Sequence, residues 1–407
     1  DNVESLYVKK INIKGNDVTK EEVIRNELII DEGDPFNEIL FNKSINQIKS
    51  LNFFKSVKFE ILDTEVENTK IININVEEKA TGEISLGAGV GTSGGTIGFS
   101  LKENNYMGKG IGLNTSLTIS EQQIRGLFSV NNPNFINGNK DLITVIESTE
   151  IDKMKNFGYK TNKIGFSLGT RYEQFEDIFF SPSISTYYED LTTSSSASNS
   201  LKKQTGDYLD VNFLYGLELD KRNSRFRPTE GYKSKFTQTL PLVTDAQTVV
   251  NGYDYQIYTE IVDKMIGSFS LFLKAANSLD GDVKVSDRLF MPERKLRGFE
   301  AGRVGPLDGD DFVGGNYLAA ATISTNIPQV FKGLDNTDLS VFFDAANIWE
   351  VDYNVNLHDS SKIRTSIGAA IDWFTPIGPL SFSLTEVISK KSTDMTEKFR
   401  FNLGTTF

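Results

Sequence analysis

Residues 6–78 show hydrophobic patterns of two kinds. Two segments place apolar residues at helical spacing and two later segments alternate apolar with polar residues, at these positions: Ile24 and Leu28; Leu40, Ile45, Ile48 and Leu51; Val57, Phe59 and Ile61; Ile72, Ile74 and Val76. With a strand expected from Leu6, they predict a compact β-α-α-β-β module. Thr19 with Glu22 predicts a capping box at the first helix, and Asn37 predicts the cap of the second.

From residue 81 onward the helical spacing ends and stretches of about ten residues alternate apolar with polar positions, most clearly over 209–219. At roughly 20 residues per strand and turn, the remaining chain has room for about sixteen strands. The predicted strands lie near 82–90, 95–103, 110–119, 122–131, 141–150, 157–171, 178–188, 207–220, 231–240, 253–263, 267–277, 315–326, 338–346, 362–373, 379–388 and 397–407.

The long connections between these strands are expected at 189–206, 241–252, 278–314 and 347–361. All of them follow odd-numbered strands, so they lie on one side, as in outer-membrane barrels with short turns inside and long loops outside. A barrel needs apolar residues only on its lipid face, and no apolar run approaches the roughly 18 residues of a spanning helix. We therefore predict an α+β module at 1–79 and a 16-stranded antiparallel transmembrane β-barrel at 80–407, with 278–314 as its long extracellular loop.

Composition narrows the possible chemistry. The chain has no cysteine and one histidine, His358, so thiolate metal sites, disulfide scaffolds and cysteine nucleophiles are excluded. A barrel protease or lipase would depend on His358 alone, and its polar surroundings favour a surface loop. We expect no cofactor, no metal and no enzymatic activity. The formal charge of −12 disfavours nucleic acid as a partner.

One carboxylate is predicted to face the barrel lumen. Asp344 alternates with Val341 and Phe343 on an amphipathic strand, so it points away from the lipid face, and Asp372 is placed in the same way on the next strand. An arginine delivered by the long loop could bind such a carboxylate through paired charge-assisted hydrogen bonds, and Arg297 lies in that loop. The alternative is that Arg297 is an ordinary solvated charge.

The first predicted barrel strand is rich in glycine. Gly87, Gly89 and Gly91 share one face of it, and glycine in a strand contributes no side-chain packing. Residues 89–94 also match a GxGxxG pattern, but another alternating strand follows where a dinucleotide site requires a helix. We therefore expect a weak seam where this strand closes the barrel against the last one, which carries Phe401, Leu403 and Phe407.

Four stretches resemble the BamA family of outer-membrane β-barrel assembly proteins. They are GND…VIRNEL…EGDPFN…FFKSV near the N-terminus, DKRNSRFRPTEGY, RLFMPERKLRGFEAGRVGP and the tail FRFNLGTTF. Leu296-Arg297-Gly298-Phe299 is similar to the family's RGF signature, and residues 6–78 resemble a POTRA domain. The resemblance implies the last POTRA domain plus the barrel, with further POTRA domains upstream. It also implies that Asp344 holds Arg297 inside the barrel, whereas a further glutamate found in some relatives is replaced here, with Ser324 in the aligned region.

The resemblance implies assembly and insertion of β-barrel proteins into the bacterial outer membrane, with the weak seam as a lateral gate and the POTRA domain in the periplasm. The implied partners are nascent outer-membrane proteins, accessory periplasmic lipoproteins and outer-membrane lipid. A two-partner secretion exporter, which also combines POTRA domains, a sixteen-stranded barrel and an RGF-type loop, remains an alternative. A passive porin is less favoured because it would need neither the module nor the loop.

Overall fold

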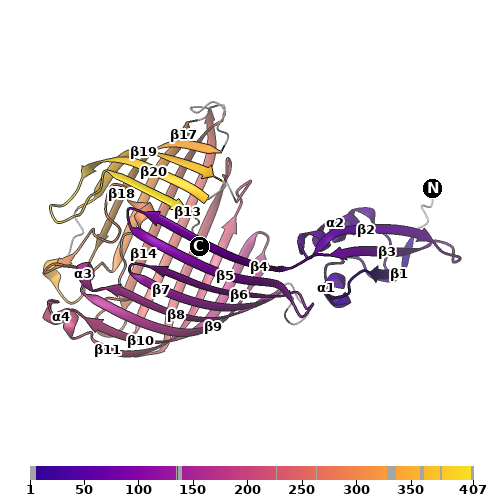
Figure 1. Cartoon of the computed structure of the whole chain (residues 1–407), viewed down its shortest axis with the longest axis horizontal. Coiled ribbons are helices and arrows are strands. Elements are labelled where there is room, and N and C mark those ends of the chain that lie inside the picture. Colours follow the sequence, from indigo (N-terminus) through magenta and orange to yellow (C-terminus); the bar gives the residue numbers. More distant parts are fainter. Residues whose placement is uncertain are drawn as a thin grey trace. The chain divides into compact units, whose positions relative to one another are not determined.

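The computed structural model describes residues 6–133, 135, 140–225, 227–262, 264–327, 336–357, 362–375 and 378–404 (Figure 1). The chain divides into two compact units. One contains the N-terminal module with 100–115 and 128–142, and the other contains 86–99, 116–127 and the chain from residue 143. In these described residues, every helix is too short or too polar to cross a bilayer.

The N-terminal module has the predicted order β-α-α-β-β. Its elements are β1 (Tyr7–Lys14), α1 (Glu21–Arg25), α2 (Glu38–Ser50), β2 (Phe54–Asp63) and β3 (Thr69–Glu78). The sheet order is β1-β3-β2, in which β1 is parallel to the central strand β3 and β2 is antiparallel to it. The helices and the sheet enclose one apolar core, whose largest fully buried side chains are Ile11, Ile24, Phe41, Ile48, Ile72 and Ile74.

The two helix starts differ from each other. Asn37 caps α2 as predicted, because its Oδ1 accepts hydrogen bonds from the backbone N–H groups of Ile39 and Leu40. The capping box at Thr19 is wrong. Lys20 stands at the N-cap of α1 without a side-chain hydrogen bond, while the Thr19 hydroxyl accepts one from Asn105 at 2.8 Å.

Sixteen antiparallel strands close into a barrel, as predicted. They are β4 (Gly82–Gly91), β5 (Gly94–Tyr106), β6 (Ile111–Ser120), β7 (Gln123–Asn132), β8 (Asp141–Lys153), β9 (Tyr159–Phe175), β10 (Ile178–Thr193), β11 (Gly206–Asp220), β12 (Gly231–Thr244), β13 (Thr248–Val262), β14 (Met265–Ser278), β17 (Tyr317–Ile327), β18 (Thr337–Trp349), β19 (Arg364–Thr375), β20 (Gly378–Ser389) and β21 (Phe399–Gly404). The boundary expected after residue 79 falls between β3 and β4.

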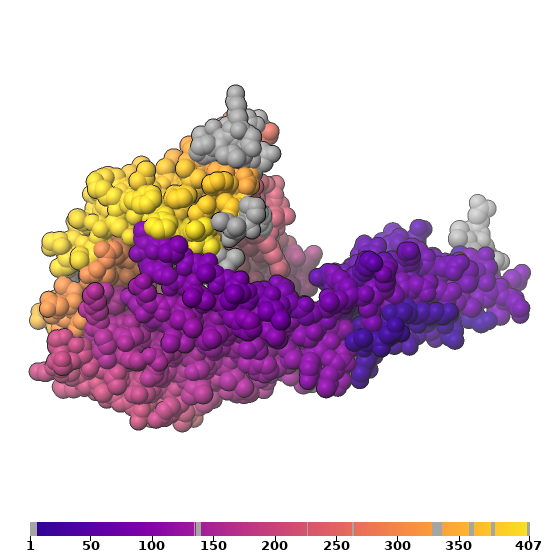
Figure 2. Space-filling view, viewed as in Figure 1, coloured from indigo at the N-terminus to yellow at the C-terminus, as the bar shows by residue number. Residues whose placement is uncertain are grey.

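The two faces of the wall separate by polarity. Apolar side chains such as Ile184 and Leu217 are exposed at 51% and 39%, whereas the neighbouring Ser185 is buried at 2%. Apolar groups on the outside and polar groups inside are the pattern that a bilayer requires of a closed barrel. In the space-filling view, the side chains of the first barrel strands, coloured purple to magenta, form a continuous outer face (Figure 2).

The connections differ in one place from the prediction. The expected long loop at 241–252 is wrong, because β12 continues to Thr244 and β13 already begins at Thr248. The connection between β10 and β11 holds α4 (Asn199–Lys202), and α3 (Met154–Phe157) lies between β8 and β9. The connection after β18 holds η2 (Val355–Leu357). The longest connection, between β14 and β17, contains η1 (Glu293–Lys295) and the hairpin β15 (Leu307–Asp308) and β16 (Asp311–Phe312).

Candidate functional site: the lumenal loop and the barrel seam

The connection 279–316, called the lumenal loop below, packs against the inner side of the wall. Leu296, Phe299 and Val304 are each 1% exposed and share an apolar cluster with Leu318 of β17 and Ile348 of β18. A second cluster joins the loop to α3, α4 and the connection after β18. Such burial holds the loop in one conformation, since releasing it would return these side chains to water.

Arg297 and Asp344 meet inside the barrel. The guanidinium donates two hydrogen bonds to the carboxylate, from Nε at 2.8 Å and from an Nη at 2.7 Å, and the backbone N–H of Arg297 donates a third at 3.0 Å. The Asp344 side chain is fully buried. A paired arrangement of this kind combines charge attraction with a fixed geometry, so it places the loop tip on β18.

Three neighbours that sequence reasoning missed complete this contact. The guanidinium lies 3.3 Å from the ring centroid of Phe342, Thr322 donates to Asp344 at 2.8 Å, and Ser366 donates to the Arg297 carbonyl at 2.6 Å. Thr322 could have been found, because it pairs with Asp344 in the β17–β18 register. Ser324, which the resemblance aligned with the family's glutamate, instead contacts the hydroxyl of Ser268.

Gly298 occupies a position that suits glycine, and Phe299 lies buried beside it. Gly298 has a φ of +88°, and a Cβ there would lie 2.6 Å from Cγ2 of Thr385. Phe299 is buried and forms an isolated antiparallel bridge with Thr396. The RGF segment therefore fits against β20 and the chain that precedes β21. Asp372, the other carboxylate considered, accepts a hydrogen bond from Ser381 and lies outside this contact.

The lumenal loop is also held near its beginning, by charges that the sequence analysis did not select. Lys284 is 2% exposed and contacts Glu189 at 2.9 Å, Asp210 at 2.8 Å and Asp287 at 3.5 Å. Burial alone would lower the pKa of Lys284, but these carboxylates outweigh it and raise the pKa above its ordinary value. No spacing rule links loop residue 284 to strands β10 and β11, so the sequence carried no signal for this cluster.

The seam between β21 and β4 is short. In the part of the chain that the structure describes, three residue pairs form its ladder: Asn402 with Gly91, Leu403 with Val90 and Gly404 with Gly89. The ladder between β10 and β11 has fourteen pairs. Gly404, the last described residue of β21, adopts a φ of +122°, outside the conformation of a regular strand.

The glycines of the seam allow close backbone contact. A Cβ at Gly91 would lie 2.7 Å from the Phe401 carbonyl oxygen, and one at Gly89 would lie 3.2 Å from that of Leu403. Gly87 has no pairing partner on β21 among the described residues. Phe407, predicted as part of the seam, lies outside the described residues, as does His358.

Glu293 of the lumenal loop reaches both sides of this seam. Its carboxylate forms an ion pair with Arg400 of β21 at 2.9 Å and accepts a hydrogen bond from the hydroxyl of Ser93, in the turn after β4, at 3.3 Å. Arg400 also donates to the Phe299 carbonyl at 3.0 Å. The loop and the seam are therefore connected by direct contacts.

Comparison with known families identifies this arrangement. The model of the Omp85 superfamily domain matches residues 105–407, and the POTRA model, described as a surface antigen variable number repeat, matches residues 6–79. The chain belongs to the Omp85 superfamily. As an Omp85 protein, it lies in the outer membrane with its POTRA domain in the periplasm.

Related Omp85 proteins cover almost the whole chain. Outer membrane protein assembly factor BamA of Neorickettsia risticii is 25% identical over 98% of this chain, and that of Neisseria meningitidis is 24% identical over 99%. The chain spans 55% and 57% of these two relatives. In structure it resembles BamA from Haemophilus ducreyi lacking POTRA domains 1–3, with a TM-score of 0.89 and 24% identity over 99% of this chain and 85% of that one. CdiB from Acinetobacter baumannii has a TM-score of 0.63 and 13% identity, over 99% and 74%.

Proposed function

We propose that this Omp85 chain assembles and inserts β-barrel proteins into the outer membrane, and that the seam between β4 and β21 is the lateral gate. The observation that carries the proposal is the short ladder of the seam, which has three pairs among the described residues against fourteen between β10 and β11. The names of the two related assembly factors support the same function. The weakest ladder of a closed wall is where the wall opens first.

Opening the seam would expose unpaired backbone groups along β4 and β21. Inside a bilayer such groups cost several kcal/mol each when they lack a partner. An incoming substrate strand removes that cost by pairing with the free edge, which is β-augmentation. The substrate barrel then grows from this edge, and folding in lipid supplies the free energy. The protein acts as a template, and we propose no enzymatic step.

The POTRA domain offers a second edge for partners. The outer edge of β1 is covered by the chain at 34–36, because the backbone N–H of Val8 donates to the Asp34 carbonyl and that of Phe36 donates to the Leu6 carbonyl. β2 is the opposite edge strand of the sheet order β1-β3-β2, and among the described residues no further strand pairs with it. Extended segments of nascent outer-membrane proteins or accessory periplasmic lipoproteins could add to β2 as a fourth strand.

A disulfide across the seam tests the gate. Val90 and Leu403 are directly opposite, and opposite residues in an antiparallel ladder lie about 4.5–5.5 Å apart, within disulfide reach. Because the chain has no cysteine, Val90→Cys/Leu403→Cys forms a single defined bond. We expect the oxidised protein to lose assembly of outer-membrane proteins in reconstituted vesicles and the reduced protein to regain it.

The matched control locks a strong ladder. Ile184 and Phe213 are opposite each other on β10 and β11, so Ile184→Cys/Phe213→Cys adds a disulfide where no opening is expected. Assembly at the normal rate by fully oxidised Val90→Cys/Leu403→Cys protein would refute the gate. Loss of assembly in both oxidised variants would also refute it, because the effect would then be general stiffening.

The alternatives predict other outcomes. A two-partner exporter that uses the central lumen keeps its activity when the seam is locked, and its structural representative here, CdiB, is the more distant match. A passive porin requires an open lumen, but the lumenal loop is packed in two apolar clusters. A large, steady single-channel conductance in planar bilayers would favour the porin.

A further inference from the structure

The inner wall carries a basic hollow in the region where β11 ends and β12 begins. Its volume is about 500 Å³, within the range of ligand sites. Five cationic side chains and two carboxylates line it, although the whole chain has a formal charge of −12. The charged residues are Arg171, Arg222, Arg225, Lys233, Lys235, Glu218 and Asp220.

The alternation of the strands places these charges in the lumen. Leu217 is exposed on the lipid face, so the next residue, Glu218, points inward. Lys235 is paired with Glu218, and Lys233 with Asp220, in the β11–β12 register, so both lysines share the inward face. Even-numbered barrel strands end on the side where β4 begins, and β11 is the eighth, so the hollow lies toward the periplasmic end.

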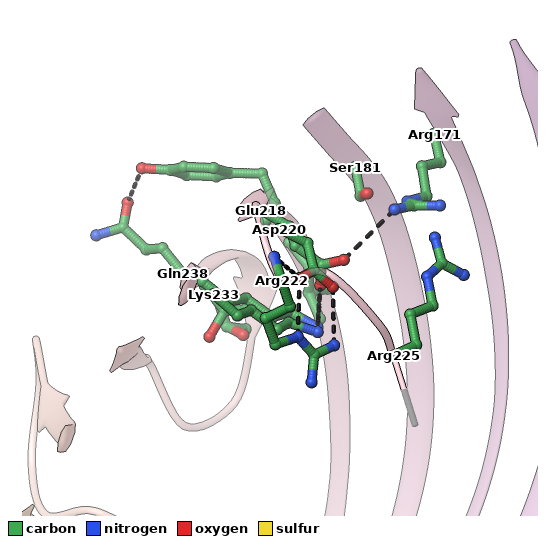
Figure 3. A pocket seen from close by; sticks show the side chains of 14 residues that line it. Arg171, Ser181, Glu218, Asp220, Arg222, Arg225, Lys233 and Gln238 are labelled. Atoms are coloured by element: carbon green, nitrogen blue, oxygen red, sulfur yellow. Dashed lines mark hydrogen bonds and ion pairs between the residues drawn. The ribbon is translucent and has the colours of Figure 1, made fainter. Parts of the chain in front are cut away.

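The cations of the hollow are incompletely neutralised. The carboxylate of Glu218 forms ion pairs with three cations, Arg171 at 3.5 Å, Lys233 at 3.3 Å and Lys235 at 3.7 Å. Asp220 forms an ion pair with Arg222 at 2.8 Å. Arg225 forms no ion pair with the described residues, and Figure 3 shows it facing the same hollow as Arg171 with no dashed line. Several cations around one carboxylate attract a further anion.

A neighbouring hollow extends this basic surface along the wall. It shares Arg222, Lys233 and Lys235 and continues to Asp254 and Lys274, so the two hollows run from β9 to β14. Phe272 adds aromatic surface to it, with Lys274 over its ring. A track of this kind fits an extended chain with repeated negative charges better than a single compact anion.

The geometry points to binding of an acidic, extended polypeptide segment along this track. The wall from β9 to β14 is paired in unbroken sequence, so lipid has no lateral path to the hollow and the ligand enters through the aqueous lumen. If the proposed function holds, on which the identity of the ligand rests, the segment is an acidic external loop of a substrate barrel. Such loops are long and polar and must reach the far side of the membrane.

Binding can be measured on the whole chain in phosphatidylcholine nanodiscs. The probe is a fluorescent decapeptide of alternating Glu and Ser, and the comparison peptide has Gln in place of Glu. We expect only the acidic peptide to bind, with affinity that falls as salt rises. In Arg225→Gln/Lys235→Gln the affinity should fall about tenfold or more, because two charge-assisted contacts are lost.

The control removes the same charge elsewhere. Lys221 lies in the same turn but pairs with Asp177, and Lys203 is exposed beyond α4, so Lys221→Gln/Lys203→Gln should bind the peptide as the unaltered protein does. Equal binding by both double variants, or an equal loss in both, would overturn the inference. Displacement of the peptide when phosphatidylglycerol is added to the bilayer would also overturn it, since the ligand would then be a lipid headgroup.

The test is independent of the gate. The track is reached through the lumen, so protein with the Val90–Leu403 disulfide should still bind the acidic peptide. Failure of the gate experiment therefore leaves peptide binding unaffected, and a protein that assembles substrates but does not bind the peptide would disprove only the track.

Discussion

Arg297 is the residue on which the position of the loop tip depends most directly. Arg297→Ala leaves the fully buried carboxylate of Asp344 with the loop N–H and Thr322 alone, and an unpaired buried charge is strongly unfavourable. We expect the tip to leave the wall and assembly to fall severalfold, while the barrel still migrates as a folded species in unheated gels. Arg297→Lys should recover part of the activity, because lysine keeps the charge but loses the paired geometry. Full complementation by Arg297→Ala at normal abundance would make Arg297 dispensable.

Substitutions at two glycines of the lumenal loop can distinguish the effect of backbone strain from that of steric crowding. Gly298 and Gly309 both have positive φ, at +88° and +66°, but a Cβ would be crowded at Gly298 only, since Gly309 has nothing within 4 Å. We expect Gly298→Ala to increase proteolysis of the loop and to reduce assembly, and Gly309→Ala to change both much less. Similar effects of the two substitutions would indicate that strain alone matters.

At the scale of elements, a clamp joins both ends of the lumenal loop to the connection after β18. Asp352 accepts hydrogen bonds from the Val283 N–H at 2.8 Å and from Asn316 at 3.0 Å, and it pairs with Arg288. Burial by itself would raise the pKa of Asp352, but Arg288 and the hydrogen bonds outweigh it and lower the pKa below its usual range. The clamp therefore stabilises the loop above the ordinary aspartate pKa of about 3.9 and is lost as pH falls through the lowered value.

This predicts an acid-induced release of the loop. A nitroxide attached at Gly309→Cys should keep the same mobility from neutral pH to about pH 4 and become more mobile below it. With Asp352→Asn the clamp loses its charge at every pH, so the acid step should be absent. A step of the same size in Asp352→Asn would assign the titration to another group.

Element types followed from the sequence, whereas several contacts did not. The sixteen strands could be placed because each must alternate between lipid and lumen. Strand parity pointed Asp344 inward, and the resemblance to the BamA family then paired it with Arg297. The loop at 241–252 was mispredicted because apolar and polar residues alternate only weakly there. In the structure β12 extends to Thr244 and β13 already begins at Thr248. Thr19 was mispredicted because a contact with Asn105, far along the chain, replaced the local cap.

At the scale of the whole molecule, Glu293 connects the loop to β21 and to the turn after β4, on the two sides of the seam. Glu293→Gln removes the ion pair with Arg400 but keeps a hydrogen-bonding side chain of the same size. We expect spin labels on Val90 and Leu403 to report a broader and longer distance distribution. Glu300→Gln is the control, because Glu300 pairs with Arg303 inside the loop. Identical distributions in both variants would show that Glu293 has no influence on the seam.

These contacts have a thermodynamic consequence for ligands that act from outside the cell. A ligand that binds the loop more tightly when Glu293 engages Arg400 must favour the closed seam by the same factor, because coupling between two binding equilibria is reciprocal. A substrate strand that holds the seam open must then weaken that ligand by an equal factor. An extracellular antibody or inhibitor directed at the loop would therefore lose affinity for protein engaged with substrate. The fraction of protein that it binds would then report the fraction that is free of substrate.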